Sequence, residues 1–102
     1  MTTKLEDKIE GIGEVKGFIF TKEFENNNGY VYKVSDGGKN HYEAFQKKET
    51  PICIDFQKRI YSDTDKKELY PKSKDFGIWA WTVLTLQKGI EILTGKELEK
   101  NR

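Results

Sequence analysis

Short apolar runs separated by turn-forming residues dominate the first two thirds of the chain. From Glu14 onward they read EVKGFIFTKEF, YVYKVS, HYEAFQKKE and ICIDFQKRIYS. Val, Ile, Tyr and Phe suit a half-buried pleated surface, and Asn28-Gly29 and Asp36-Gly37-Gly38 supply the positive φ angles that tight hairpins need. The pattern predicts four strands in an antiparallel meander between about Glu14 and Ser62.

Within two of these runs apolar side chains alternate with polar ones, which is typical of a sheet that is buried on one face. In the second run the apolar set is Tyr30, Tyr32 and Val34, and in the fourth run it is Ile52, Ile54 and Phe56. We therefore expect another element of the chain to cover one face of the meander.

A helix is predicted from Phe76 to Leu93, with Ser73 or Asp75 as its cap and Gly95 as its C-terminal stop. The fold class is then α+β, a four-stranded antiparallel β-meander packed against one C-terminal α-helix. Residues 62–75 (SDTDKKELYPKSKD) are polar and are expected to be a surface connection.

The same patterns divide the chain into three parts. Residues 1–13 form an N-terminal arm, loose or folded as a short helix, and residues 14–95 form a single α+β domain. Residues 96–102 form a charged C-terminal tail.

The two tryptophans of the chain, Trp79 and Trp81, fall on opposite sides of the predicted helix. The core side is expected to hold Phe76, Trp79, Val83, Leu86, Ile90 and Leu93. The opposite side holds Ile78, Trp81, Thr85 and Ile92. Two interpretations of Trp81 stay open. In the first, Trp81 is part of the core, because the sheet curves around the helix or because the connection and the N-terminal arm cover it. In the second, these four residues form an exposed stripe that binds a protein partner or a second copy of the chain.

Composition narrows the class of protein. The chain has 102 residues, 34% of them charged, and its 18 basic and 17 acidic side chains leave a net charge of +1. Such a balance gives no strong field to attract nucleic acid or membrane. The single cysteine excludes an intramolecular disulfide, and no segment has the apolar length of a signal peptide or a membrane span. A cytoplasmic location is expected.

Several short motifs resemble known binding or catalytic motifs, but the residues or predicted elements around them do not match those that such motifs require. Gly11, Gly13 and Gly17 lead into a predicted strand, whereas a phosphate loop follows a strand and opens a helix. Asp75-Phe76-Gly77 lacks the other kinase motifs, and Asp63 and Asp65 lack the further oxygen ligands of a calcium loop. We predict no metal and no cofactor.

A nucleophilic pair could be built only from Cys53 and His41, the single cysteine and the single histidine, with Glu43 or Asp55 orienting the imidazole. The simpler interpretation makes Cys53 a small apolar filler and His41 a polar residue at a strand edge. Because the carboxylates show no paired arrangement either, the chain is predicted not to be an enzyme and to have no catalytic residues.

Nucleic acid is the alternative partner. Basic residues flank the third and fourth predicted strands near aromatic rings, and such a surface can stack bases and follow phosphates. The candidate residues are Lys47, Lys48, Lys58, Arg59 and Tyr61. The near-zero net charge and the presence of only two arginines favour a protein partner instead.

Two stretches resemble a group of small bacterial proteins common in phages and mobile elements. The first is His41, Tyr42, Glu43 and Phe45, and the second is Tyr70, Pro71, Phe76, Gly77, Ala80 and Trp81. The resemblance implies a β-meander followed by one helix and brings no catalytic residues. It also implies a setting in which small single-domain proteins bind and block host machinery, as anti-CRISPR inhibitors do. The expected function is therefore a protein-binding inhibitor.

Overall fold

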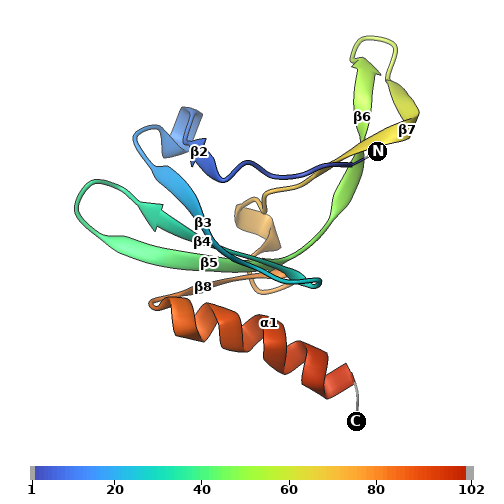
Figure 1. Cartoon of the computed structure of the whole chain (residues 1–102). Coiled ribbons are helices and arrows are strands. Elements are labelled where there is room, and N and C mark those ends of the chain that lie inside the picture. The colour runs from blue at the N-terminus through green and yellow to red at the C-terminus, as the bar shows by residue number, and fades with distance from the viewer. Residues whose placement is uncertain (1, 101–102) are drawn as a thin grey trace.

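Two antiparallel-rich sheets and one C-terminal helix make up the computed structural model of the chain (Figure 1). It describes residues 2–100, with the side chains of all of these except 14 and 96–100. The larger sheet has five antiparallel strands in the order β2 (Lys8–Glu10), β3 (Ile19–Glu25), β4 (Gly29–Ser35), β5 (Asn40–Gln46) and β8 (Ala80–Val83). The smaller sheet has the order β1 (Thr2–Thr3), β7 (Ile60–Glu68) and β6 (Glu49–Asp55), with β1 parallel to β7. The helix α1 spans Leu86–Lys100.

The α+β class is confirmed, whereas the prediction of four strands was too low, because the described residues contain eight. Strands β4 and β5 lie where the second and third of the predicted runs placed them. The N-terminal residues form neither a loose arm nor a helix, since β1 and β2 add an edge strand to each sheet. Both strands are short and mostly polar, so the hydrophobic pattern gave no indication of them.

The two faces of the five-stranded sheet are buried by different elements. One face carries aromatic side chains packed ring against ring: Phe20, Tyr30, Tyr32, Phe45, Tyr70 and Trp79. The other face carries Val31 and Ala44, which pack against Leu93 of α1. Gly89 of α1 lies so close to the sheet that a Cβ there would be 2.8 Å from a methyl group of Val31. The core is therefore aromatic on one face of the sheet, and on the other face it is formed by Val31, Ala44 and Leu93 beneath the helix.

The predicted helix from Phe76 to Leu93 was wrong in both its start and its end. Residues 80–83 pair with β5 as strand β8, after a turn in which Gly77 has φ +91°. The helix begins only at Leu86, where the Thr85 hydroxyl accepts a hydrogen bond from the Lys88 N–H. It continues past Gly95 to Lys100, and the last two residues of the predicted charged tail lie outside the described residues. No helix in the described part of the chain has the length and apolarity to cross a membrane.

The two tryptophans do occupy different environments, as the sequence predicts. Trp79 is 6% exposed and joins the aromatic face, where its ring meets Phe45 edge to face. Trp81 pairs with Ala44 across β8 and β5, which places it on the helix-covered face, half-buried. The reason is strand alternation together with the turn before β8, and helical periodicity plays no part.

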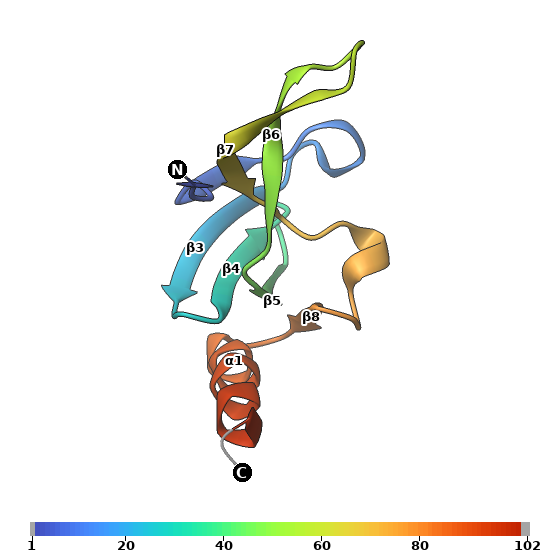
Figure 2. The ribbon, with the colours of Figure 1, turned by 90° about the vertical axis from the view of Figure 1, so that its right-hand side faces the viewer.

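Strands β6 and β7 form a hairpin that projects from the rest of the molecule (Figure 2). The sequence pattern read Ile52 to Ser62 as a single strand, but residues 56–59 form a turn and β7 runs on through Glu68. Half of the predicted surface connection, residues 62–68, is therefore part of the second strand of this hairpin. The turn was missed because it contains no glycine or asparagine. Arg59 adopts the positive φ of 54° instead, and the Asp55 carboxylate accepts the Lys58 N–H.

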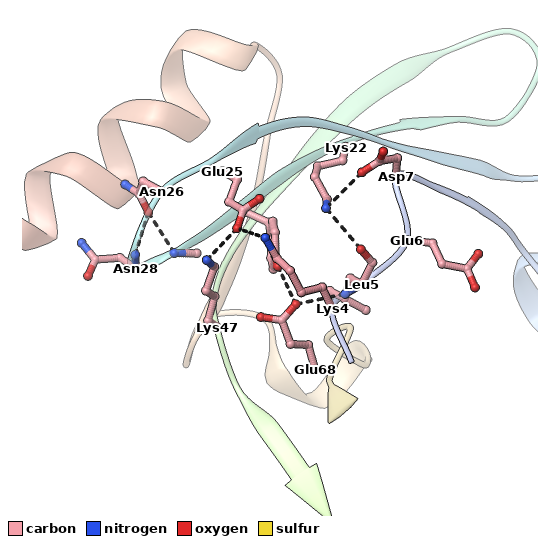
Figure 3. Close-up of polar contacts among 12 residues, drawn as sticks. Lys4, Leu5, Glu6, Asp7, Lys22, Glu25, Asn26, Asn28, Lys47 and Glu68 are labelled. Atoms are coloured by element: carbon pink, nitrogen blue, oxygen red, sulfur yellow. Dashed lines mark hydrogen bonds and ion pairs between the residues drawn. The ribbon is translucent and has the colours of Figure 1, made fainter. Parts of the chain in front are cut away.

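A network of polar contacts ties the N-terminal segment to the root of this hairpin and to the aromatic face (Figure 3). The Glu68 carboxylate of β7 accepts hydrogen bonds from the Leu5 N–H and from the Tyr30 hydroxyl. Lys22 donates to the Leu5 carbonyl and pairs with Asp7 at 3.1 Å. The small sheet is thus anchored to the large one through Glu68.

Glu25 is the second anchor of this network. Its carboxylate lies 2.7 Å from the Lys4 ammonium and 2.8 Å from the Lys47 ammonium. Hydrogen bonds from these two lysines lower the pKa of Glu25 to about 2. The carboxylate is therefore held in its charged form across the neutral and mildly acidic range.

Candidate functional site

The described residues contain a cleft of about 490 Å³ beside the aromatic face of the large sheet. Its apolar walls are formed by Ile12, Val15, Phe18, Phe20, Pro71 and Phe76. A cleft of this volume, mostly apolar and with a few polar groups, has the size and character of a small-ligand site. It is the first candidate for function.

The glycine-rich segment forms one rim of this cleft. Residues 13–15 make a single 3-10 turn, and Gly13 and Gly17 adopt positive φ angles of 62° and 94°. These turns leave Ile12 82% exposed at the cleft. The glycines therefore shape a loop with apolar side chains, and the segment opens into strand β3 rather than a helix.

Three polar side chains meet at the floor of the cleft. The Tyr70 hydroxyl donates a hydrogen bond of 2.7 Å to Glu43 Oε1, and the His41 Nε2 donates one of 3.2 Å to Glu43 Oε2. Burial, followed by the charge of Glu43, raises the pKa of Tyr70 far above its ordinary value. Tyr70 thus remains a neutral hydrogen-bond donor at any physiological pH.

Two distant stretches of chain supply this trio. His41 and Glu43 are two residues apart on β5, so they point to the same face, where Tyr32 and Val34 of β4 lie opposite them. Tyr70 and the buried Pro71 come shortly after β7, which ends at Glu68. Residues far apart in the sequence therefore meet at this cleft.

The second candidate site is the tip of the β6–β7 hairpin. It carries exposed apolar side chains at fractions that are high for residues of this size: Ile54 67%, Phe56 85%, Ile60 45% and Tyr61 51%. Lys58 and Arg59 lie in the turn between them. We define these six residues as the hairpin tip. The sequence pattern expected Ile54 and Phe56 on a buried face, because it did not reveal that the strand leaves the core.

The four residues predicted to bind a partner do not form one stripe, because they do not share a helix. Ile78 is exposed in the turn before β8, Trp81 is half-buried on β8, and Thr85 caps α1. Only Ile92 lies on the helix, and it is half-buried. The proposed helical surface, as drawn from the sequence, was therefore wrong.

The five residues of the nucleic-acid alternative separate into two groups. Lys47 and Lys48 lie at the root of the hairpin, where Lys47 pairs with Glu25 and the Lys48 ammonium lies 5.1 Å from the centre of the Trp79 ring. Lys58, Arg59 and Tyr61 lie at the hairpin tip, about 20 Å away along a seven-residue strand. The structure brings only the second group together.

The remaining chemical candidates are also separated. Cys53 is exposed on β6 of the small sheet, whereas His41 lies on β5 of the large sheet and contacts Glu43. Asp63 and Asp65 lie on β7, and no group of three His, Cys, Asp or Glu side chains among the described residues could hold a metal ion.

The sequence contained one signal for the cleft. For the hairpin tip it singled out only Lys58, Arg59 and Tyr61, as part of the nucleic-acid alternative. The spacing of His41 and Glu43 in an alternating strand predicts that they are neighbours, but Tyr70 comes from a segment whose path is set only by tertiary packing. No protein-family model, curated protein or solved structure matches the chain. Its function is therefore inferred from geometry and chemistry.

Proposed function

We propose that the protein is a non-enzymatic protein-binding module that contacts its partner through the hairpin tip. The observation that carries this proposal is the set of exposed apolar side chains, Ile54, Phe56, Ile60 and Tyr61, gathered on a projecting hairpin. Exposed apolar patches of this kind are typical of interaction sites, and aromatic and arginine side chains are the usual anchors of protein interfaces.

The charge of the hairpin favours a protein over nucleic acid. Residues 49–68 contain four basic and five acidic side chains, so Lys58 and Arg59 are offset by their neighbours. Affinity for nucleic acid without base recognition comes mainly from neutralised phosphates and released counterions. Burial of Phe56 and Ile54 in an apolar pocket of a protein needs no such charge. The resemblance stated from the sequence motifs supports the further proposal that the partner is part of the host machinery and that binding inhibits it.

The test is a matched set of pull-downs from host lysate. The bait is the wild-type chain, the double variant Ile54→Ser/Phe56→Ser, or the control Leu84→Ser, whose side chain is 82% exposed outside the hairpin. We expect one protein to be retained by the wild type and the control, to resist nuclease and salt, and to be lost with the double variant. Urea unfolding of the three proteins checks that the fold is unchanged.

Three results would overturn the proposal. One is that every captured protein binds the double variant as well as the wild type. Another is capture of RNA or DNA with a steep salt dependence that Lys58→Glu/Arg59→Glu abolishes, which would make the tip a nucleic-acid site. The third is a wild-type dimer in light scattering that the double variant converts to a monomer, which would make a second copy the occupant.

A further inference from the structure

We propose that the cleft beside His41, Glu43 and Tyr70 binds a cationic amine with an apolar body. The ammonium group would meet the Glu43 carboxylate, and the body would lie against the apolar walls. This site is separate from the hairpin tip and does not depend on the function proposed for the tip.

The carboxylate of Glu43 is the first observation. Its side chain is only 14% exposed, and its partners among the described residues are the Tyr70 hydroxyl and the His41 imidazole. A carboxylate has about four acceptor positions, so two remain beyond these contacts. No lysine or arginine of the described residues pairs with it, and a partly buried negative charge without a permanent cation costs free energy. A ligand cation would offset that cost.

The walls are the second observation. Phe18, Phe20 and Phe76 line the cleft together with Ile12, Val15 and Pro71. Aromatic faces attract ammonium groups, and apolar walls favour a body that leaves water. The combination of one carboxylate with aromatic rings is selective for cations that carry an apolar group.

The other charged lining group does not reverse this preference. Lys72 lies at the rim and is exposed to solvent, so water screens its charge. Glu43 lies deeper, where electrostatic interactions are stronger because the surroundings are less polar. Binding is measured at a fixed pH of 8.

Three probes that share an apolar phenyl-alkyl body and differ in the charge of their end group test whether the cleft prefers a cation. These are 4-phenylbutylamine, 4-phenylbutanol and 4-phenylbutyrate, titrated into the full chain by calorimetry or ligand-observed NMR. Hydrogen bonds to charged groups contribute more than neutral ones. We expect the amine to bind at least about tenfold more tightly than the alcohol, which corresponds to about 1.4 kcal/mol, and the carboxylate to bind most weakly.

Two variants separate the contribution of the probe's ammonium group from that of its apolar body. Glu43→Gln keeps the shape and can still accept from Tyr70, and it should reduce amine binding to the level of the alcohol. Ile12→Asn removes an exposed apolar rim residue and should weaken the amine and the alcohol alike. The hairpin variant Ile54→Ser/Phe56→Ser should leave all three probes unaffected, so failure at one site is distinguishable from failure at the other.

The natural amine could be a free small molecule or a lysine side chain of a protein. An acetylated and amidated Leu-Lys-Leu peptide distinguishes these sources, because tighter binding than 4-phenylbutylamine would identify a protein segment and weaker binding a small molecule. Equal affinity of the amine and the alcohol for the wild type would overturn the proposal. So would an amine affinity that Glu43→Gln leaves unchanged, or tighter binding of the carboxylate.

Discussion

Substitution of the glycine beneath α1 is a sharp test of how the helix packs on the sheet. Gly89 is in the first half of α1, and a Cβ added there would lie 2.8 Å and 3.1 Å from the two methyl carbons of Val31. Ordinary carbon contacts are about 3.5–4.0 Å. Val31 is fully buried and β-branched, so its methyl groups cannot move aside without a change in backbone or rotamer.

Two effects of Gly89→Ala oppose each other. Alanine in a helix is more favourable than glycine by about 1 kcal/mol. Overpacking of a core position typically destabilises by about 1–3 kcal/mol. We expect overpacking to win, so that Gly89→Ala lowers the free energy of unfolding by about 1 kcal/mol. The assay is urea unfolding followed by tryptophan fluorescence.

Gly95 provides the matched control on the same helix. A Cβ at Gly95 meets no atom within 4 Å, so Gly95→Ala should show the propensity gain alone and raise the free energy of unfolding by about 0.5–1 kcal/mol. A second check removes the side-chain atoms that a Cβ at position 89 would contact. In a Val31→Ala background the two methyl groups are gone, and Gly89→Ala should then stabilise as Gly95→Ala does. Equal changes in the free energy of unfolding for the two glycine variants in the wild-type background would show that α1 does not pack tightly on Val31.

The remaining predictions concern the core, the polar network and the hairpin. Trp79→Ala should lower the free energy of unfolding by about 3–5 kcal/mol, because Trp79 is 6% exposed and packs on Phe45; a loss below about 1 kcal/mol in urea unfolding would place it outside the core. Glu25 has a folded pKa of about 2 against an ordinary 4.5, so its contribution is full above pH 4.5 and is lost as pH falls toward 2. With its solvent exposure that contribution is at most about 1 kcal/mol, and the difference in stability between wild type and Glu25→Gln should shrink between pH 5 and pH 3; a constant difference would contradict it. Cys53 is exposed, so a thiol reagent should label it in the folded protein without a lag for unfolding. Labelling much faster than a free thiol would reveal an activated cysteine and argue against a non-enzymatic protein.

Hydrophobic alternation in the sequence predicted a strand's place in the fold correctly only where the alternating apolar side chains are buried. In β4 it was, because Tyr30, Tyr32 and Val34 all face the aromatic core, and the strand was predicted correctly. In β6 and the first residue of the turn after it, the same alternation of Ile52, Ile54 and Phe56 accompanies a strand that leaves the core. Alternation identifies a strand, but it does not identify what covers it.

The mistaken helix illustrates a second limit. Residues 80–83 (AWTV) fit a helical wheel and also contain residues that favour strands, so local pattern left both structures open. The free edge of β5 decided between them, since pairing with β8 supplies hydrogen-bond partners that a helix at this point would leave missing. The Thr85 cap was a readable signal for the true helix start, but the wheel gave Thr85 a place in the interior of a longer helix.

The contacts of Glu68 explain why an exposed hairpin can serve as a binding element. A hairpin of two strands alone is marginally stable in water. Here the end of β7 is fixed by the Leu5 N–H and the Tyr30 hydroxyl, which both donate to Glu68, and the Leu69 N–H donates to the Lys48 carbonyl at 2.9 Å. Tyr30 is fully buried, so the root of the hairpin is joined to the aromatic core of the molecule. A tip presented on an anchored root loses less conformational freedom on binding than a free loop would, and more of the free energy from burying Phe56 and Ile54 remains as affinity.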